Sequence, residues 1–170
     1  MSNSRKMQGT LKQFDASEHA IYDVAGKTAM LTYLNKKIQK YKTIENPNKY
    51  GIDLLTLDEN NKVHFCWELE VRHGNWKEDT AFPFKEINCI ERKDYQWRHD
   101  QEFYDKIPFQ VSNNCVAYYV QLNKQCNRAV IIRDSIILQH ELKLWANRKA
   151  DNEYVRQVPV TSATEIDLRQ

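Results

Sequence analysis

Glycine and proline are both scarce in this sequence, with four of each among 170 residues. The glycines stand apart at positions 9, 26, 51 and 74, so the chain has no glycine-rich loop that could cradle a phosphate. This absence argues against a nucleotide-binding α/β enzyme. Apolar runs are also short, and none approaches the ~20 residues that span a bilayer. The opening segment MSNSRKMQGT is polar, unlike a signal peptide, so we expect no membrane partner.

A strong charge of one sign is missing as well. The formal net charge is +2, so no overall field points to nucleic acid, and any basic surface must be local. The four cysteines show no CxxC spacing, and Cys66, Cys89 and Cys115 lie in apolar runs. We interpret these three as buried free thiols, which fits a protein of the reducing cytoplasm.

The composition is that of one soluble globular domain, with 41% hydrophobic and 28% charged residues. No internal repeat, low-complexity block or linker divides the chain. We expect residues 1–15 to be a flexible polar lead and residues 16–170 to form a single domain.

Periodicity predicts an α/β order of elements. Apolar residues recur three or four apart between positions 17 and 41, which predicts a helix that ends before the breaker ENPN at 45–48. Segments rich in β-formers predict strands. Residues 94–106 are expected to form a short helix, and residues 140–151 fit a helix or a strand equally. The helix should pack on a sheet through Ile21, Val24, Leu31, Leu34 and Ile38, and the expected strands are 50–57, 62–72, 84–91, 114–122, 128–134, 135–139 and 153–160.

Three acids interrupt the first two strands. Asp53 lies within the apolar run GIDLLTL, while Glu68 and Glu70 alternate with apolar residues in HFCWELEVR. If residues 58–61 form the turn, Asp53 pairs with about residue 66 and Glu68 is its diagonal neighbour, within ~7–8 Å. Converging carboxylates select Mg²⁺ or Mn²⁺. A second interpretation makes Glu68, Glu70 and Arg72 the solvated face of a surface hairpin, and spacing alone does not decide between the two.

GIDLL followed by HFCWELEVR resembles the core of the PD-(D/E)xK nucleases over roughly residues 17–93. The resemblance implies an α/β restriction-endonuclease-like fold, in which helices flank a central mixed β-sheet. It also implies a Mg²⁺-dependent (or Mn²⁺-dependent) endonuclease that hydrolyses DNA phosphodiester bonds. Phage or mobile-element origin, action in the cytoplasm of a bacterial or phage-infected host cell, and a homodimer are compatible with it.

Two features of the family pattern are absent. No proline directly precedes Asp53, and no lysine follows the second acid by two positions. If the motif is Glu68-Leu69-Glu70, Asp53 and Glu68 are metal ligands and Glu70 is a ligand or orients water. If it is Glu70-Val71-Arg72, an arginine takes the place of the lysine, although it cannot lose a proton. We favour the first register, and keep as the alternative a catalytically inactive fold that binds DNA or protein.

The resemblance also suggests further site residues. Cations near the third strand would stabilise charge on the phosphate, and a helix acid, Glu18 or Glu45, would reach the metal. The polar loop after the second strand is a candidate DNA contact. The predicted catalytic residues are thus Asp53, Glu68, Glu70 and Arg72, and the predicted substrate contacts are Lys85, Arg92, Lys93, Trp76 and Lys77.

Overall fold

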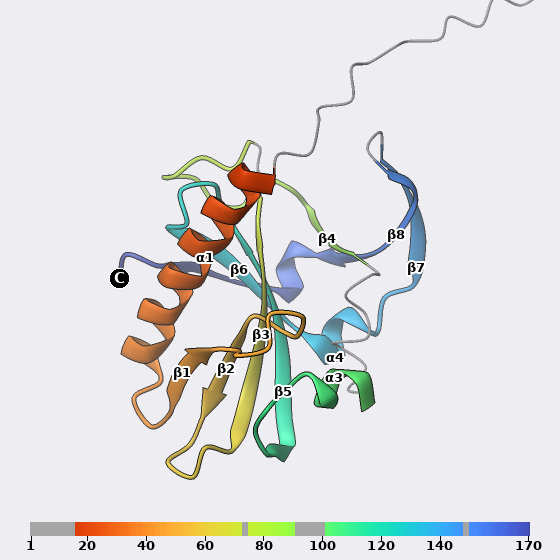
Figure 1. Ribbon diagram of the computed structural model, residues 1–170. Helices are drawn as coiled ribbons and strands as arrows, with labels where there is room; N and C mark the ends of the chain where they lie inside the picture. Colours follow the sequence, from red (N-terminus) through yellow and green to blue (C-terminus); the bar gives the residue numbers. More distant parts are fainter. Residues whose placement is uncertain (1–15, 73–74, 91–100, 148–149) are drawn as a thin grey trace, which may run out of the picture.

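The computed structural model describes residues 16–72, 75–90, 101–147 and 150–170. In this part of the chain, a six-stranded sheet has the order β1-β2-β3-β5-β6-β9 and a three-stranded sheet the order β4-β8-β7. Figure 1 shows α1 along one face of the larger sheet, with the smaller sheet and the short helices α3 and α4 on its other side. The expected lead, residues 1–15, lies outside the described residues.

The elements follow the chain in the order helix, three strands and then a mixed remainder. The helices are α1 Ala16–Lys37, α3 Gln101–Asp105 and α4 Asp134–Ile137, with a 3-10 turn at Val160–Ser162. The strands are β1 Lys42–Glu45, β2 Leu54–Leu57, β3 Val63–Val71, β4 Glu86–Ile90, β5 Val111–Leu122, β6 Arg128–Arg133, β7 Leu142–Asn147, β8 Ala150–Pro159 and β9 Thr164–Asp167.

The larger sheet is mixed. Strands β1, β2 and β3 form an antiparallel meander, and β3 then pairs in parallel with β5. A parallel neighbour requires a long crossover, and the segment between β3 and β5 provides it. Strand β5 runs antiparallel to β6, and β6 to β9. In the strand order, β3 and β5 are the inner pair of the sheet. The predicted α/β class with a mixed sheet is therefore confirmed.

Helix α1 lies on the sheet through part of the predicted stripe, because Leu31, Leu34 and Ile38 pack in the core between the helix and the sheet. Met30 and Leu34 are buried, whereas Ile21 and Val24 are 68% and 63% exposed, so their predicted place in the core is wrong. At Gly26 the helix comes so close that an added Cβ would lie 2.8 Å from Val71 Cγ2. Positions 26, 30 and 34 are four residues apart and therefore lie on the same side of the helix, which faces the sheet. The close approach at Gly26 thus sets the rotation of the helix and turns Ile21 and Val24 away from the sheet.

The face opposite α1 carries the larger core. Its buried side chains come from both sheets and both short helices: Cys66 on β3, Tyr119 on β5, Ile87 on β4, Phe103 on α3 and Ile137 on α4. The other core lies between α1 and the sheet and includes Trp67 and Leu69. Alternate residues of β3 thus enter two different cores; the sequence pattern predicted the division between two faces, but not that both faces are buried.

Several elements differ from those expected. Residues 135–139 were predicted as a strand, but 134–137 form α4, which buries Ile137. The expected strand 50–57 begins only at Leu54, and the undecided stretch 140–151 contains β7 and the start of β8. Strands β1 and β9, both of four residues, had no clear apolar pattern of their own. They form because the edges of β2 and β6 offer backbone partners.

Candidate functional site

Asp53 lies in the bend directly before β2 and not inside the strand. Leu54 pairs with Trp67, so continuing this antiparallel register places Asp53 beside Glu68. The predicted diagonal arrangement is corrected for two reasons: Leu57 pairs with Val63, so the turn holds residues 58–62, and a register shift between Thr56 and Leu57 adds one more residue. The Leu69 backbone N–H donates to Asp53 Oδ2 at 2.8 Å, which ties the carboxylate to β3.

Glu68 and Glu70 belong to a row of polar side chains on the inner strands. In the β3–β5 register Glu68 pairs with Tyr119, and Glu70 pairs with Gln121. Glu68 is only 5% exposed, and Tyr119 and Gln121 are fully buried. The interpretation of these acids as the solvated face of a surface hairpin is therefore wrong for Glu68. These four residues form a two-by-two polar array on the face that otherwise builds the larger core.

A hydrogen-bonded chain holds Glu70 in this array. Tyr119 OH donates to Glu70 Oε2, and Gln121 Nε2 donates to Tyr119 OH and to the Asn88 carbonyl, each at 3.0 Å. Burial and, second, the nearby negative charge of Glu70 raise the pKa of the Tyr119 hydroxyl well above its usual value. Tyr119 therefore keeps its proton at neutral pH and acts as a hydrogen-bond donor to Glu70.

Lys27 on α1 is a site residue that the sequence patterns did not indicate. Its ammonium lies 3.2 Å from Asp53 Oδ1 and 3.0 Å from Asp23 Oδ2. Burial lowers the pKa of Lys27, but hydrogen bonds and charge attraction from Asp23 and Asp53 outweigh this effect and raise it. No local motif joins Lys27 to Asp53, since 25 intervening residues separate them in the sequence. Only the helix–sheet packing brings them together.

The other predicted site residues are scattered. Arg72 follows β3, is half-buried, and donates its backbone N–H to the Leu122 carbonyl. Lys77 and Lys85 are exposed, as a substrate contact requires. Trp76 is 3% exposed, and its indole N–H donates to the Thr80 carbonyl at 3.1 Å. Its predicted contact with DNA is therefore wrong, because the ring belongs to the core.

Some candidates fall outside what the structure describes. Arg92 and Lys93 are among the residues left undescribed, and so is the side chain of Glu18. Glu45, the other candidate helix acid, is exposed at the end of β1, where it pairs with Leu54. It therefore belongs to a strand and not to a helix.

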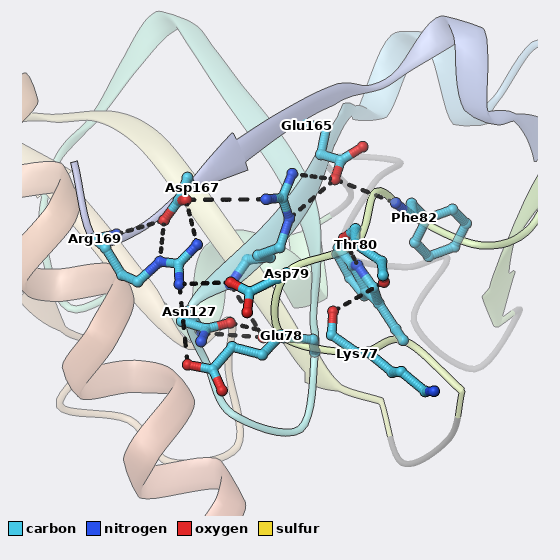
Figure 2. A network of polar contacts seen from close by, with 12 residues as sticks. Lys77, Glu78, Asp79, Thr80, Phe82, Asn127, Glu165, Asp167 and Arg169 are labelled. Atoms are coloured by element: carbon cyan, nitrogen blue, oxygen red, sulfur yellow. Dashed lines mark hydrogen bonds and ion pairs between the residues drawn. The ribbon is translucent and has the colours of Figure 1, made fainter.

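The loop between β3 and β4 is attached to the C-terminal segment by ion pairs. Figure 2 shows Arg169 between Asp167 and Asp79, at 2.7 and 3.1 Å, while Glu165 accepts a hydrogen bond from the Phe82 backbone N–H at 3.2 Å. Arg128 also binds Glu165, at 2.8 Å. These contacts connect the described part of the loop, residues 75–85, to β6, β9 and the residues that follow β9.

The donor chemistry of Asp53, Glu68 and Glu70 suits Mg²⁺ or Mn²⁺, because both ions prefer carboxylate oxygens. Within the described ranges, however, no three His, Cys, Asp or Glu side chains are grouped closely enough to hold a metal ion. Asp53 instead contacts Lys27, and Glu70 accepts a hydrogen bond from Tyr119. In this conformation a lysine and a tyrosine hydroxyl therefore engage two of the three predicted ligands.

Comparison with known proteins found no match to a family model, to a curated protein or to a solved structure. Among the described helices, none is both long and apolar enough to cross a membrane.

Proposed function

We propose that the protein is a metal-dependent endonuclease that hydrolyses DNA phosphodiester bonds on a restriction-endonuclease-like fold. One observation carries this proposal: Asp53, directly before β2, lies beside the buried Glu68 of β3 in the continued register. The resemblance rests on an acid in one strand and acids in the next, and here Asp53 directly precedes β2. A helix that precedes the strands and a central mixed sheet agree with the same fold.

The burial of Glu68, and the partial burial of Asp53 and Glu70, support a functional role over a structural one. Taking a carboxylate out of water costs several kcal/mol unless charges and hydrogen bonds compensate. A core that needed only stability would use an apolar residue at position 68, as β3 does at Trp67 and Leu69. Clusters of buried, hydrogen-bonded ionisable groups are typical of catalytic sites.

The residues for a metal centre would be Asp53 and Glu68, with Glu70 as a further ligand or as the group that orients water. A bound Mg²⁺ or Mn²⁺ would supply a water of lowered pKa and a Lewis acid at the phosphate. Tyr119 donates to one oxygen of Glu70 and so fixes the direction of the other. The exposed Lys77 and Lys85 would bind the DNA backbone through its phosphates.

The experiment is cleavage of plasmid and linear DNA by the purified full chain, with Mg²⁺ or Mn²⁺ and with EDTA. Asp53→Asn and Glu68→Gln should each abolish cleavage, because each removes one negative charge from the site. Glu59→Gln is the matched control, since Glu59 is an exposed acid in the turn of the same hairpin. It should cleave like wild type.

Loss of cleavage in Asp53→Asn and Glu68→Gln, but not in Glu59→Gln, supports the nuclease. DNA or RNA cleavage that persists in EDTA, or in Asp53→Asn, refutes the proposed site. A folded wild-type chain that binds Mn²⁺ but cuts neither DNA nor RNA across varied substrates favours the inactive binding module.

A further inference from the structure

The contact between Lys27 and Asp53 is the strongest feature that the proposed mechanism does not use. The Lys27 ammonium bridges the carboxylates of Asp53 and Asp23, at 3.2 and 3.0 Å. The side chains of Lys27 and Asp53 are 21% and 16% exposed, whereas that of Asp23 is 53% exposed. The bridge thus joins an inner carboxylate to an outer one.

Close packing of α1 holds this lysine in place. Gly26 allows the helix to approach Val71 so closely that even a methyl group would overlap it. Met30 and Leu34 are buried on the same side of the helix. Lys27 follows Gly26 directly, so its stem starts next to the sheet, on the side where β2 begins. The ion pair is therefore a product of the helix–sheet interface and not of a chance surface encounter.

Both oxygens of Asp53 take part in these contacts. Oδ2 accepts the Leu69 backbone N–H, and Oδ1 contacts the Lys27 ammonium. The backbone bond belongs to the sheet and does not compete with a cation on the other oxygen. A divalent ion that approaches Oδ1 meets the lysine. Since like charges repel at partly buried sites, the ammonium would weaken the binding of a divalent ion to this oxygen.

We propose that Lys27 is an internal cation that occupies Asp53 and competes with the divalent metal ion for it. This inference rests on the proposed metal-dependent function. With a metal ion on Asp53, the Lys27 ammonium would keep its contact with the exposed Asp23 and would be available to bind a phosphate oxygen of the substrate. Lys27 therefore makes metal affinity lower than the carboxylates alone would give, and it couples metal binding to the placing of a positive charge for the substrate.

The test is Mn²⁺ binding by titration calorimetry to the full chain, without DNA. Wild type is compared with Lys27→Met, Lys27→Gln and Asp53→Asn. The matched control is Lys37→Met, which removes the same charge from the same helix ten residues away, or ~15 Å along the axis. Measurements at about 0.1 M and 1 M salt show whether a lysine affects Mn²⁺ affinity by direct contact or by long-range repulsion. Long-range repulsion is screened at high salt, because the screening length falls from ~10 to ~3 Å.

We expect Lys27→Met and Lys27→Gln to bind Mn²⁺ about tenfold more tightly than wild type at both salt concentrations, as removal of a partly buried charged contact implies. Lys37→Met should bind like wild type, and Asp53→Asn should lose binding. Without metal, Lys27→Met should melt at a lower temperature than wild type. Addition of Mn²⁺ should make this difference in melting temperature smaller. On the unmutated chain, the side-chain NMR signal of Lys27 should shift during a Mg²⁺ titration.

The inference is overturned if wild type binds Mn²⁺ through Asp53 while both Lys27 variants bind equally or more weakly. A Lys27 signal that does not respond to saturating Mg²⁺ overturns it too, and this readout needs no folded variant. In both outcomes the proposed metal site still stands. If neither wild type nor the Lys27 variants bind Mn²⁺, the metal site itself is refuted, and the inference falls with it.

Discussion

The change Tyr119→Phe tests the polar array most directly. It removes one oxygen from a fully buried side chain and leaves the ring in the core. That oxygen donates to Glu70 and accepts from Gln121 Nε2. The variant therefore leaves a carboxylate without its phenolic donor and an amide nitrogen without one of its two acceptors.

The expected cost at neutral pH is about 2 kcal/mol, because a hydrogen bond to a charged group contributes about 1.5–3 kcal/mol. For a chain of this size this corresponds to a fall of roughly 4–8 °C in melting temperature. Urea unfolding monitored by circular dichroism measures the same difference as a lower midpoint. Tyr118→Phe is the matched control: Tyr118 is the next residue, lies on the other face, and stacks on Trp67 with ring centroids 4.6 Å apart. It should change stability by less than about 0.5 kcal/mol.

The pH dependence gives an independent check. A tyrosine in the unfolded chain loses its proton near pH 10, whereas burial raises the pKa of Tyr119 well above that value in the folded protein. From about pH 10 upward the folded state therefore holds one more proton than the unfolded state. Its stability falls by about 1.4 kcal/mol per pH unit, and below this range the contribution is constant.

Tyr119→Phe lacks this proton, so the stability gap between wild type and variant should shrink as the pH rises from about 10 to 11. Other tyrosines and lysines titrate in the same range, but they cancel in the difference between the two proteins. A gap that is absent at pH 8, or one that stays constant up to pH 11, would refute the account of Tyr119 as a buried donor to Glu70.

Two further predictions concern packing and the C-terminal ion pairs. Met30→Asp should prevent folding, because an unpaired buried charge costs several kcal/mol. Ile21→Asp should change the melting temperature little, since Ile21 is exposed. Similar melting temperatures for the two variants would contradict the rotation of α1. Hydrogen bonds from Arg169 lower the pKa of Asp167, so their stabilising effect is present above about pH 4 and is lost as the pH falls below it. The melting temperatures of wild type and Arg169→Ala should therefore differ at neutral pH and converge in acid, and a constant difference would argue against the ion pair.

Strand β3 shows how far sequence reasoning reaches. Its alternation of apolar and acidic residues predicted the strand, its approximate ends and the division of its side chains between two faces, and all three are confirmed. For α1 the same reasoning was right about Leu34 but wrong about Ile21 and Val24, which fit the helical spacing as well as Met30 does. Spacing alone does not show which side of a helix faces the sheet. The close approach of the helix to Val71 at Gly26 identifies that side.

The candidate site divides in the same way. The sequence by itself singled out Asp53, Glu68 and Glu70, because acids inside apolar strands are visible in the pattern of each strand. Only the tertiary structure decided which groups meet them. Lys27 reaches Asp53 across the helix–sheet interface, and Tyr119 reaches Glu70 across the parallel β3–β5 pair, whose partners are 49 residues apart in the chain. A local pattern reports which face a side chain occupies, but the register between distant strands and the rotation of a helix are set by packing of the whole core, and these decide the partners of each charge.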